Sequence, residues 1–206
     1  MTRWAVLVLL NSLLLAPLTV AQAEALTLTA LTERLASHMQ QRSRFVQLKT
    51  VNGLSRPLRS TGEVLVLPEH GVLYQLQKPM VARYGIGRDK LVLEEAGQQK
   101  VLQASDAPWL RTLGRLLHSL LSGELAALEQ DFHCQLSSTD AGWQLRLTPR
   151  REPLSLALTD VQLQGNDTVQ QVLIRDKNGD QTTLQFEALP PAAPSAAEQA
   201  LLDQLK

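Results

Sequence analysis

The chain has 206 residues, which suits one domain with a small appendage, and its hydrophobic fraction of 44% is sufficient for a single core. Its 20 lysine and arginine residues balance its 20 aspartate and glutamate residues, so the formal net charge is zero. Because the sequence also lacks a block of basic residues, it argues against a nucleic-acid partner. Cys134 is its one cysteine, so an internal disulfide is excluded and the core alone has to stabilise the fold.

The first 23 residues carry the features of an export signal. Arg3 precedes an almost wholly apolar run over residues 4–15, Pro17 interrupts that run, and Ala21-Gln22-Ala23 provides the small-x-small pattern that signal peptidase requires. A retained membrane anchor is the alternative, but the run is short for a span of roughly 20 residues. We therefore expect residues 1–23 to be a signal peptide and the mature protein to be soluble.

The next segment predicts a helix followed by a series of strands. Leucines at spacings of three and four residues predict an amphipathic helix over residues 26–41, with Thr27 or Thr29 as its cap. From Ser43 the hydrophobic period changes to two, and Gly62 is expected to form a bulge or bend. Strands are expected over residues 45–49, 58–67, 72–77, 82–87, 90–94 and 99–103.

A second helix interrupts the strands. Residues 107–122 carry leucines at i, i+3, i+4 and i+7 on a helix that ends at Gly123, and residues 124–131 add another turn or two. This helix is so rich in leucine that we expect it to be buried or to cover an apolar surface. Strands resume at Phe132, with further strands over residues 143–148, 160–164, 168–175 and 182–187. Asn178-Gly179 predicts a hairpin turn between the last two.

The order of these elements predicts an α+β fold with a single antiparallel sheet over residues 24–188. A sheet of about ten strands curls, so we expect an open half-barrel whose concave face is plugged or lidded by the helices. Residues 189–206 are expected to form a Pro/Ala-rich linker and a short C-terminal helix. An apolar concave face under movable helices is a binding site for an oily molecule. The residues expected to line it are Val64, Val66, Val72, Tyr74, Leu76, Trp109, Leu113, Leu117, Trp143, Leu145 and Leu147.

Signs of catalysis or of a cofactor are missing from the sequence. The four histidines, at positions 38, 70, 118 and 133, have neither the mutual spacing nor the cysteine companions of a metal site. No Gly-rich phosphate loop and no nucleophile elbow is present. We therefore expect a binding protein with no cofactor and no metal. An esterase remains an alternative, and it would need a Ser, a His and an acid that meet in space.

Several short motifs together resemble the periplasmic outer-membrane lipoprotein carrier family of LolA-like proteins. The resemblance covers essentially the whole mature chain and is closer to a divergent branch linked to glycolipid or aryl-polyene export, with Leu120-Leu121-Ser122-Gly123. The matching residues are Phe45-Val46-Gln47, Ser60-Thr61-Gly62-Glu63-Val64, Gly71-Val72-Leu73-Tyr74, Lys78-Pro79, residues 145–149 and residues 172–182.

The resemblance implies a half-barrel fold. With the cleaved signal peptide we expect a periplasmic location, and we expect a monomer. The resemblance also implies an acylated lipoprotein or glycolipid cargo, an inner-membrane transporter as donor and an outer-membrane acceptor. The family carries a latch arginine beside a proline before the turn at Gly71, whereas this chain has Leu67-Pro68-Glu69. That departure and the low aromatic fraction of 4% leave room for an amphiphile other than a lipoprotein. A lipid-sensing regulatory protein of the same fold is the alternative function.

Overall fold

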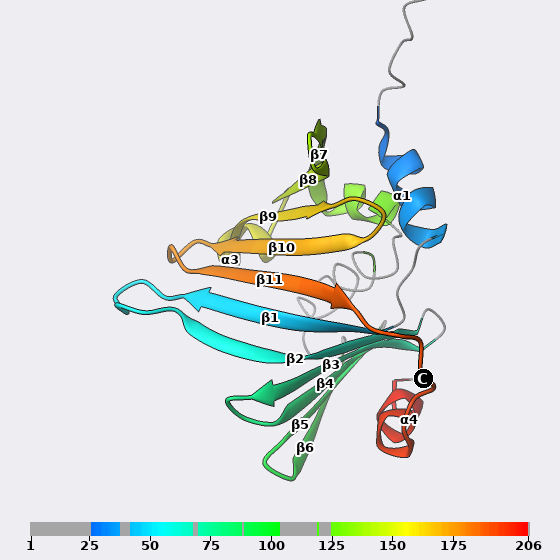
Figure 1. Ribbon diagram of the computed structural model, residues 1–206. Coiled ribbons are helices and arrows are strands. Elements are labelled where there is room, and N and C mark those ends of the chain that lie inside the picture. The colour runs from blue at the N-terminus through cyan, green and yellow to red at the C-terminus, as the bar shows by residue number, and fades with distance from the viewer. Residues whose placement is uncertain are drawn as a thin grey trace, which may run out of the picture.

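The computed structural model describes residues 26–37, 42–67, 70–87, 89–103, 119 and 125–205. Its described part contains one antiparallel sheet of 11 strands in the order β6-β5-β4-β3-β2-β1-β11-β10-β9-β8-β7 (Figure 1). The strands are β1 (Arg42–Thr50), β2 (Leu58–Leu67), β3 (Gly71–Lys78), β4 (Ala82–Ile86), β5 (Lys90–Glu95), β6 (Gln98–Gln103), β7 (Phe132–Thr139), β8 (Gly142–Pro149), β9 (Leu158–Gly165), β10 (Val169–Asp176) and β11 (Gln181–Ala188). The predicted α+β class with a single large open sheet is confirmed.

The helices agree with the sequence pattern in part. Helix α1 (Leu28–Ser37) is shorter than predicted, and the Thr27 hydroxyl caps it by accepting a hydrogen bond from the Ala30 amide at 3.1 Å. Helix α4 (Ala196–Asp203) follows the Pro/Ala-rich segment, as expected. Two short elements, the 3-10 helix η1 (Leu125–Gln130) and α3 (Leu154–Ala157), flank β7 and β9, and α3 was not predicted. The predicted signal peptide, residues 38–41 and the predicted helix over residues 107–122 lie outside the described residues.

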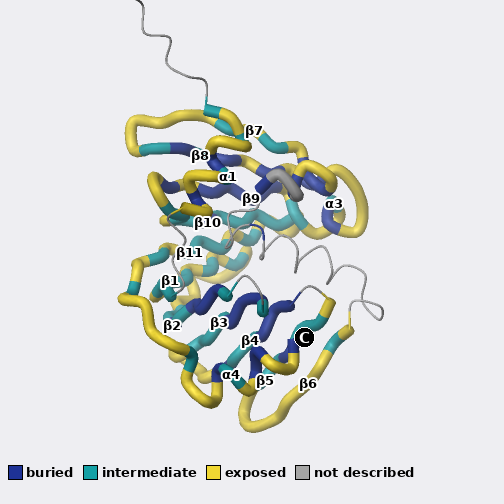
Figure 2. Tube along the Cα trace, turned by 90° about the vertical axis from the view of Figure 1, so that its right-hand side faces the viewer, coloured by how far each residue is buried: buried dark blue, intermediate teal, exposed yellow. Residues whose placement is uncertain are grey.

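The sheet curls so that one face is turned inwards. In Figure 2, strands β7 to β9 arch over the top, β1 and β11 form the back, and β3 to β6 form the floor. Because side chains alternate along a strand and directly paired residues share a face, the register assigns each residue to a side. We call the side that carries Phe45 the concave face and the other side the convex face. Phe45 pairs with Gly62 of β2 and Phe186 of β11 across its two neighbouring strands.

A bulge bends the sheet at Gly62. The pairing of β2 with β3 shifts register between Thr61 and Gly62, which confirms the predicted bulge. A Cβ atom at Gly62 would lie 2.8 Å from Cζ of Phe45 and would collide with the carbonyl oxygen of Gln75. The Phe45 ring therefore lies against the bare glycine, and it stacks on the Tyr74 ring with centroids 4.3 Å apart.

The same arrangement recurs at Trp143 on β8. Its direct partner on β9 is Gly165, where a Cβ atom would lie 3.0 Å from Cζ2 of the indole. The indole Nε1 donates a hydrogen bond to the Asn166 carbonyl at 2.7 Å, so the polar edge of this buried ring is satisfied. A second register shift, between Val169 and Gln171 of β10, lies beside this glycine.

The C-terminal helix covers the convex face of β2, β3 and β5. Leu65, Leu73 and Val92 form a fully buried cluster with Leu201, Leu202 and Leu205 of the C-terminal segment. The capping box of α4 is complete: the Ser195 hydroxyl accepts from the Glu198 amide, and the Glu198 carboxylate accepts from the Ser195 amide. Packing on the sheet and capping together fix the position of this short helix.

Glu198 also anchors α4 to the sheet through an ion pair. Arg42 of β1 donates two hydrogen bonds to its carboxylate, at 2.8 and 3.1 Å, and Gln75 donates a third at 2.7 Å. The two charged side chains are only 12% and 9% exposed, and Glu63 lies 3.4 Å from the same guanidinium. The hydrogen bonds from Arg42 lower the pKa of Glu198 to about 2, against the opposing effect of burial.

Gly62→Ala should destabilise the fold by about 1–3 kcal/mol, because the added methyl group collides with the Phe45 ring and the β3 backbone. Urea unfolding followed by circular dichroism measures the change. Ser60→Ala, two residues earlier on the same face of β2, is the control and should lie within about 0.5 kcal/mol of the wild type. Equal stability of the Gly62→Ala protein and the wild type would contradict this account of the bulge.

Glu198→Gln should cost about 1–3 kcal/mol near pH 7, because it leaves the Arg42 charge with the weaker Glu63 contact alone. The folded-state pKa of Glu198 lies below its unfolded value, so its stabilising effect is complete above about pH 5 and is lost as the pH falls towards 2. The difference between wild type and variant in urea unfolding should therefore shrink between about pH 5 and pH 3. A constant difference across that range would be inconsistent with this role of the carboxylate.

Candidate functional site: the concave face of the sheet

The predicted lining residues that the structure describes all lie on the concave face. Val64, Val66, Val72, Tyr74 and Leu76 come from β2 and β3, and Trp143, Leu145 and Leu147 come from β8. The register links the two groups to the Phe45 side of the sheet through every intervening strand. Trp109, Leu113 and Leu117 lie outside the described residues, so the predicted lining set remains a prediction as a whole.

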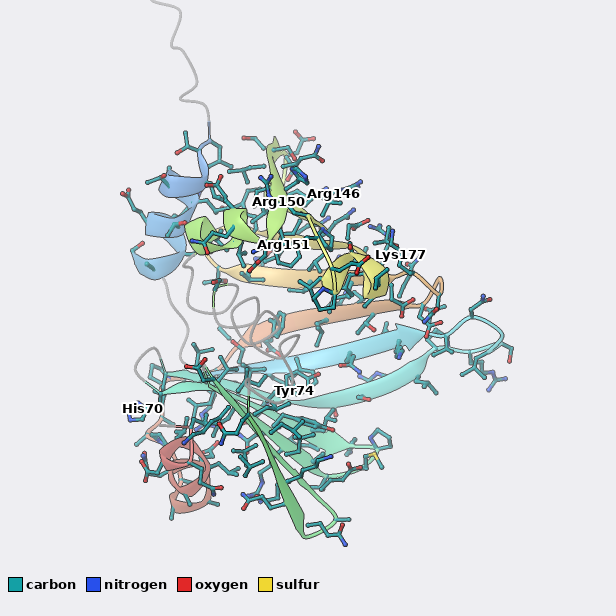
Figure 3. All side chains as sticks on the ribbon, turned by 180° about the vertical axis from the view of Figure 1, so that it is seen from behind. His70, Tyr74, Arg146, Arg150, Arg151 and Lys177 are labelled. Carbon is teal, nitrogen blue, oxygen red and sulfur yellow. The ribbon has the colours of Figure 1, made fainter. Side chains whose placement is uncertain are left out.

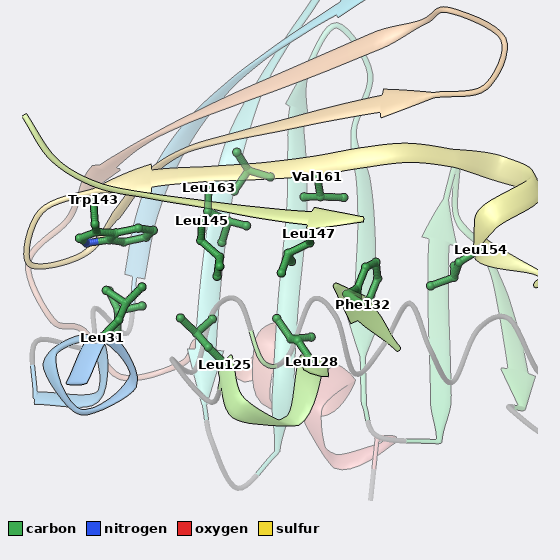
Figure 4. Close-up of a cluster of buried hydrophobic side chains, with 12 residues drawn as sticks. Leu31, Leu125, Leu128, Phe132, Trp143, Leu145, Leu147, Leu154, Val161 and Leu163 are labelled. Carbon is green, nitrogen blue, oxygen red and sulfur yellow. The ribbon is translucent and has the colours of Figure 1, made fainter. Parts of the chain in front are cut away.

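One end of the concave face is covered by α1 and η1. Leu31 of α1 and Leu125 and Leu128 of η1 pack under β8 and β9, as Figure 4 shows, and Leu35 of α1 belongs to the same cluster. We call this set the α1 cluster; its buried members are Leu31, Leu35, Leu125, Leu128, Phe132, Trp143, Leu145, Leu147, Leu154, Val161, Leu163 and Val172. The predicted residues on β8 thus belong to one buried cluster with the first helix and η1.

The other end of the face is formed by the Phe45 cluster. It contains Phe45, Val64, Val66, Val72 and Ile86, with the partly buried Tyr74, Leu76 and Leu91 packed against it. The aliphatic residues lie near the turn between β2 and β3, and Tyr74 lies further along β3 on the inner side of the sheet (Figure 3). This end therefore combines aliphatic side chains near the β2–β3 turn with the stacked rings of Phe45 and Tyr74.

Two residues of β11 join the two clusters. Leu184 and Phe186 pack against both the α1 cluster and the Phe45 cluster, and both remain only partly buried. Apolar residues of the described part therefore extend across the face from β8 to β5. Sequence reasoning did not assign these two residues to the lining, although their alternation with Gln185 in the predicted strand over residues 182–187 carried the signal.

A polar pair interrupts this apolar surface. The Tyr74 hydroxyl donates a hydrogen bond of 2.7 Å to the side-chain oxygen of Gln47 on β1. Burial raises the pKa of Tyr74, so its hydroxyl stays protonated and keeps this bond at all ordinary pH values. Gln47 and Tyr74 therefore form a hydrogen-bonded polar pair on the concave face.

Helix α1 is held mainly by its apolar side. Leu31 is fully buried and Leu35 is 5% exposed, both within the α1 cluster. On the outside, Arg34 pairs with Asp167 at 2.8 Å and donates to the Asn166 side chain at 2.9 Å, in the turn between β9 and β10. This pair is 42% and 54% exposed, so solvent screens it and it contributes little. The apolar contacts therefore decide whether the helix stays in place.

The one cysteine of the chain is not activated, and no metal cluster is found among the described residues. The half-buried Cys134 has a pKa raised to about 11 by burial, so its thiol is protonated and unreactive near neutrality. His133 projects to the opposite face of β7. Within the described ranges, no three His, Cys, Asp or Glu side chains are grouped to hold a metal ion. Among the same residues, no helix has the length and apolar character needed to cross a bilayer.

Comparisons with known proteins identify relatives of this chain. Residues 20–205 match the family described as outer membrane lipoprotein carrier protein LolA-like. A LolA superfamily protein from Nitrosomonas europaea is 14% identical, with a TM-score of 0.44 over 82% of this chain and 96% of that chain. A putative outer membrane lipoprotein-sorting protein domain from Vibrio parahaemolyticus is 9% identical, with a TM-score of 0.41 over 85% and 99%. No curated protein matches the chain significantly.

Leu31→Ala should release α1 far more than Arg34→Ala does. Loss of the buried side chain costs about 2–4 kcal/mol, whereas loss of the exposed ion pair costs less than about 1 kcal/mol. Hydrogen exchange of the α1 amides, read by mass spectrometry, should accelerate strongly in the first variant and slightly in the second. The reverse order would show that the ion pair, and not the apolar contact, holds the helix.

Proposed function

Because the chain belongs to the LolA-like family of outer membrane lipoprotein carrier proteins, we propose that it binds acyl chains on its concave face and carries them towards the outer membrane. The cargo is an acylated lipoprotein or another amphiphile such as a glycolipid. The observation that supports this most is the partly buried apolar surface of Leu184 and Phe186, which joins the α1 cluster to the Phe45 cluster. The protein acts by binding and not by catalysis.

Burial of the acyl chain supplies the free energy of this binding. Each CH₂ group that leaves water contributes about 0.8 kcal/mol. A surface that runs from β5 to β8 offers such a chain contact along its length. Within it, the Tyr74 oxygen can accept a hydrogen bond from a polar head group and the Gln47 amide nitrogen can donate one. Because α1 is held by a few apolar contacts, it serves as the lid that moves when cargo enters.

The cellular setting follows from the same proposal. Residues 1–23 direct export and are removed, and the monomeric remainder, with its half-barrel and C-terminal helix, works in the periplasm. An inner-membrane transporter supplies the cargo and an outer-membrane acceptor receives it. In place of the family's latch arginine near Pro68, the apolar packing of α1 keeps the empty carrier closed.

Leu184→Asn should weaken binding of a fluorescent fatty-acid probe to the delipidated protein by roughly tenfold, because it removes about 1.4 kcal/mol of apolar contact from the shared surface. Leu48→Asn is the matched control: Leu48 lies on the convex face of neighbouring β1 and is 38% exposed, so its replacement should leave binding unchanged. Fluorescence titration measures both, and thermal melts confirm that both variants are folded. Equal binding by the two variants would refute the assignment of the concave face.

Transfer separates a carrier from a sensor of the same fold. The protein loaded with a labelled acyl compound should deliver it from donor vesicles to acceptor vesicles faster than the compound crosses unaided. Mass spectrometry of lipids extracted from the protein as purified from its own cell identifies the cargo. Binding without transfer would favour the lipid-sensing alternative, and absence of both would refute a role in lipid handling.

A further inference from the structure

Exposed apolar side chains gather at one end of the half-barrel. Because neighbouring strands are antiparallel, the turns after β1, β3, β5 and β10 and the segment before β9 all lie at the same end. We call this end the hairpin rim; it comprises residues 51–58, 78–81, 95–97, 150–157 and 177–180. The tips of β1–β2, β3–β4 and β10–β11 lie together at the left of Figure 1.

Most of the exposed large apolar side chains of the described residues lie on this rim. Seven large apolar side chains are exposed in that part of the protein, and five of them are rim residues: Leu54 (52%), Leu58 (52%), Met80 (55%), Val81 (66%) and Leu156 (66%). They come from three separate tips, and Leu156 projects from α3 while its neighbour Leu154 is buried. Exposed apolar side chains do not stabilise the fold. Because five of them gather at one end, we infer that this end contacts an apolar surface of a binding partner.

The charge of the rim is complementary to an anionic surface. Its exposed cations are Arg56, Lys78, Arg150, Arg151 and Lys177, and its exposed carboxylates are Glu95 and Glu152. Asp180 of the rim is engaged by Lys49 and the Asn52 amide, and two carboxylates next to the rim are engaged as well: Asp131 by Arg151, and Asp176 by the amides of Asn178 and Asp180. Figure 3 shows Lys177 at this end, far from His70 at the other.

We propose that the hairpin rim docks on the surface of an anionic phospholipid bilayer, with Leu54, Met80, Val81 and Leu156 inserted among the head groups and the basic side chains beside them on lipid phosphates. Separate apolar tips between cations suit a fluid interface, into which each tip inserts on its own. A surface that binds a protein partner is typically one continuous apolar patch with a polar rim, which these separate tips do not form. Docking by this rim does not depend on the cargo, so it goes beyond the carrier function proposed above.

Flotation with cargo-free vesicles tests the proposal. Every variant is prepared in the same way, so any contribution of the N-terminal segment to vesicle binding is the same in all of them. Wild-type protein should float with vesicles of phosphatidylethanolamine containing about 30% phosphatidylglycerol and much less with phosphatidylcholine alone. Leu54→Asn, Met80→Gln and Leu156→Asn combined should reduce partitioning by about tenfold or more. Val101→Asn, which alters an exposed apolar residue in the middle of β6, is the matched control and should change nothing.

Two further variants test charge and insertion. Arg56→Glu with Lys177→Glu should remove the preference for phosphatidylglycerol, as should salt on the order of 0.5 M. Met80→Trp should gain fluorescence that brominated lipids quench, beyond the signal of the wild-type tryptophans. The proposal is overturned if the triple variant partitions like the wild type, if Val101→Asn loses as much, or if Met80→Trp is not quenched. Binding to cell-derived membranes that is abolished by protease, without binding to pure lipid vesicles, would show a protein partner instead.

Discussion

The ring of Phe45 lies against Gly62 on the neighbouring strand, and the indole of Trp143 lies against Gly165 in the same way. Each glycine allows an aromatic ring to approach the backbone more closely than any other residue would, and each lies beside a register shift. Bulges and glycines with aromatic partners are the features that bend a sheet. With one on β2 and the other on β9, the 11 strands curl and their apolar side chains converge on the inside.

Curvature gives the two faces different roles. The concave face is apolar from β5 to β8, and its central residues Leu184 and Phe186 are only partly covered by the protein itself. The buried apolar residues of the convex face gather where α4 packs, and the Glu198 carboxylate both caps that helix and neutralises Arg42. The apolar cluster of the convex face is therefore covered by α4, whereas Leu184 and Phe186 on the concave face stay partly exposed. That difference is what a protein needs if it is to shelter an apolar guest and stay folded without it.

Alternation of apolar residues was sufficient to predict the strands, the open antiparallel sheet and the shared face of Val72, Tyr74 and Leu76. It did not reveal α3, because Leu154 to Ala157 is too short for a helical period to show. Nor did it reveal the convex cluster of Leu65 and Leu73, which appears only when α4 folds back over β2 and β3. Partners separated by more than a hundred residues, such as Arg42 and Glu198, leave no local pattern in the chain.

The environment of Cys134 makes its thiol slow to form a disulfide under oxidising conditions. Thiol–disulfide exchange proceeds through the thiolate, and with a pKa of about 11 only about one Cys134 in ten thousand is ionised at pH 7. Its sulfur also lies half-buried on the inner side of β7, packed against the α1 cluster, which limits the access of another thiol. An unpaired cysteine would otherwise cross-link copies of the chain to one another. Here the same apolar lining that surrounds the sulfur protects the protein from unwanted covalent dimers.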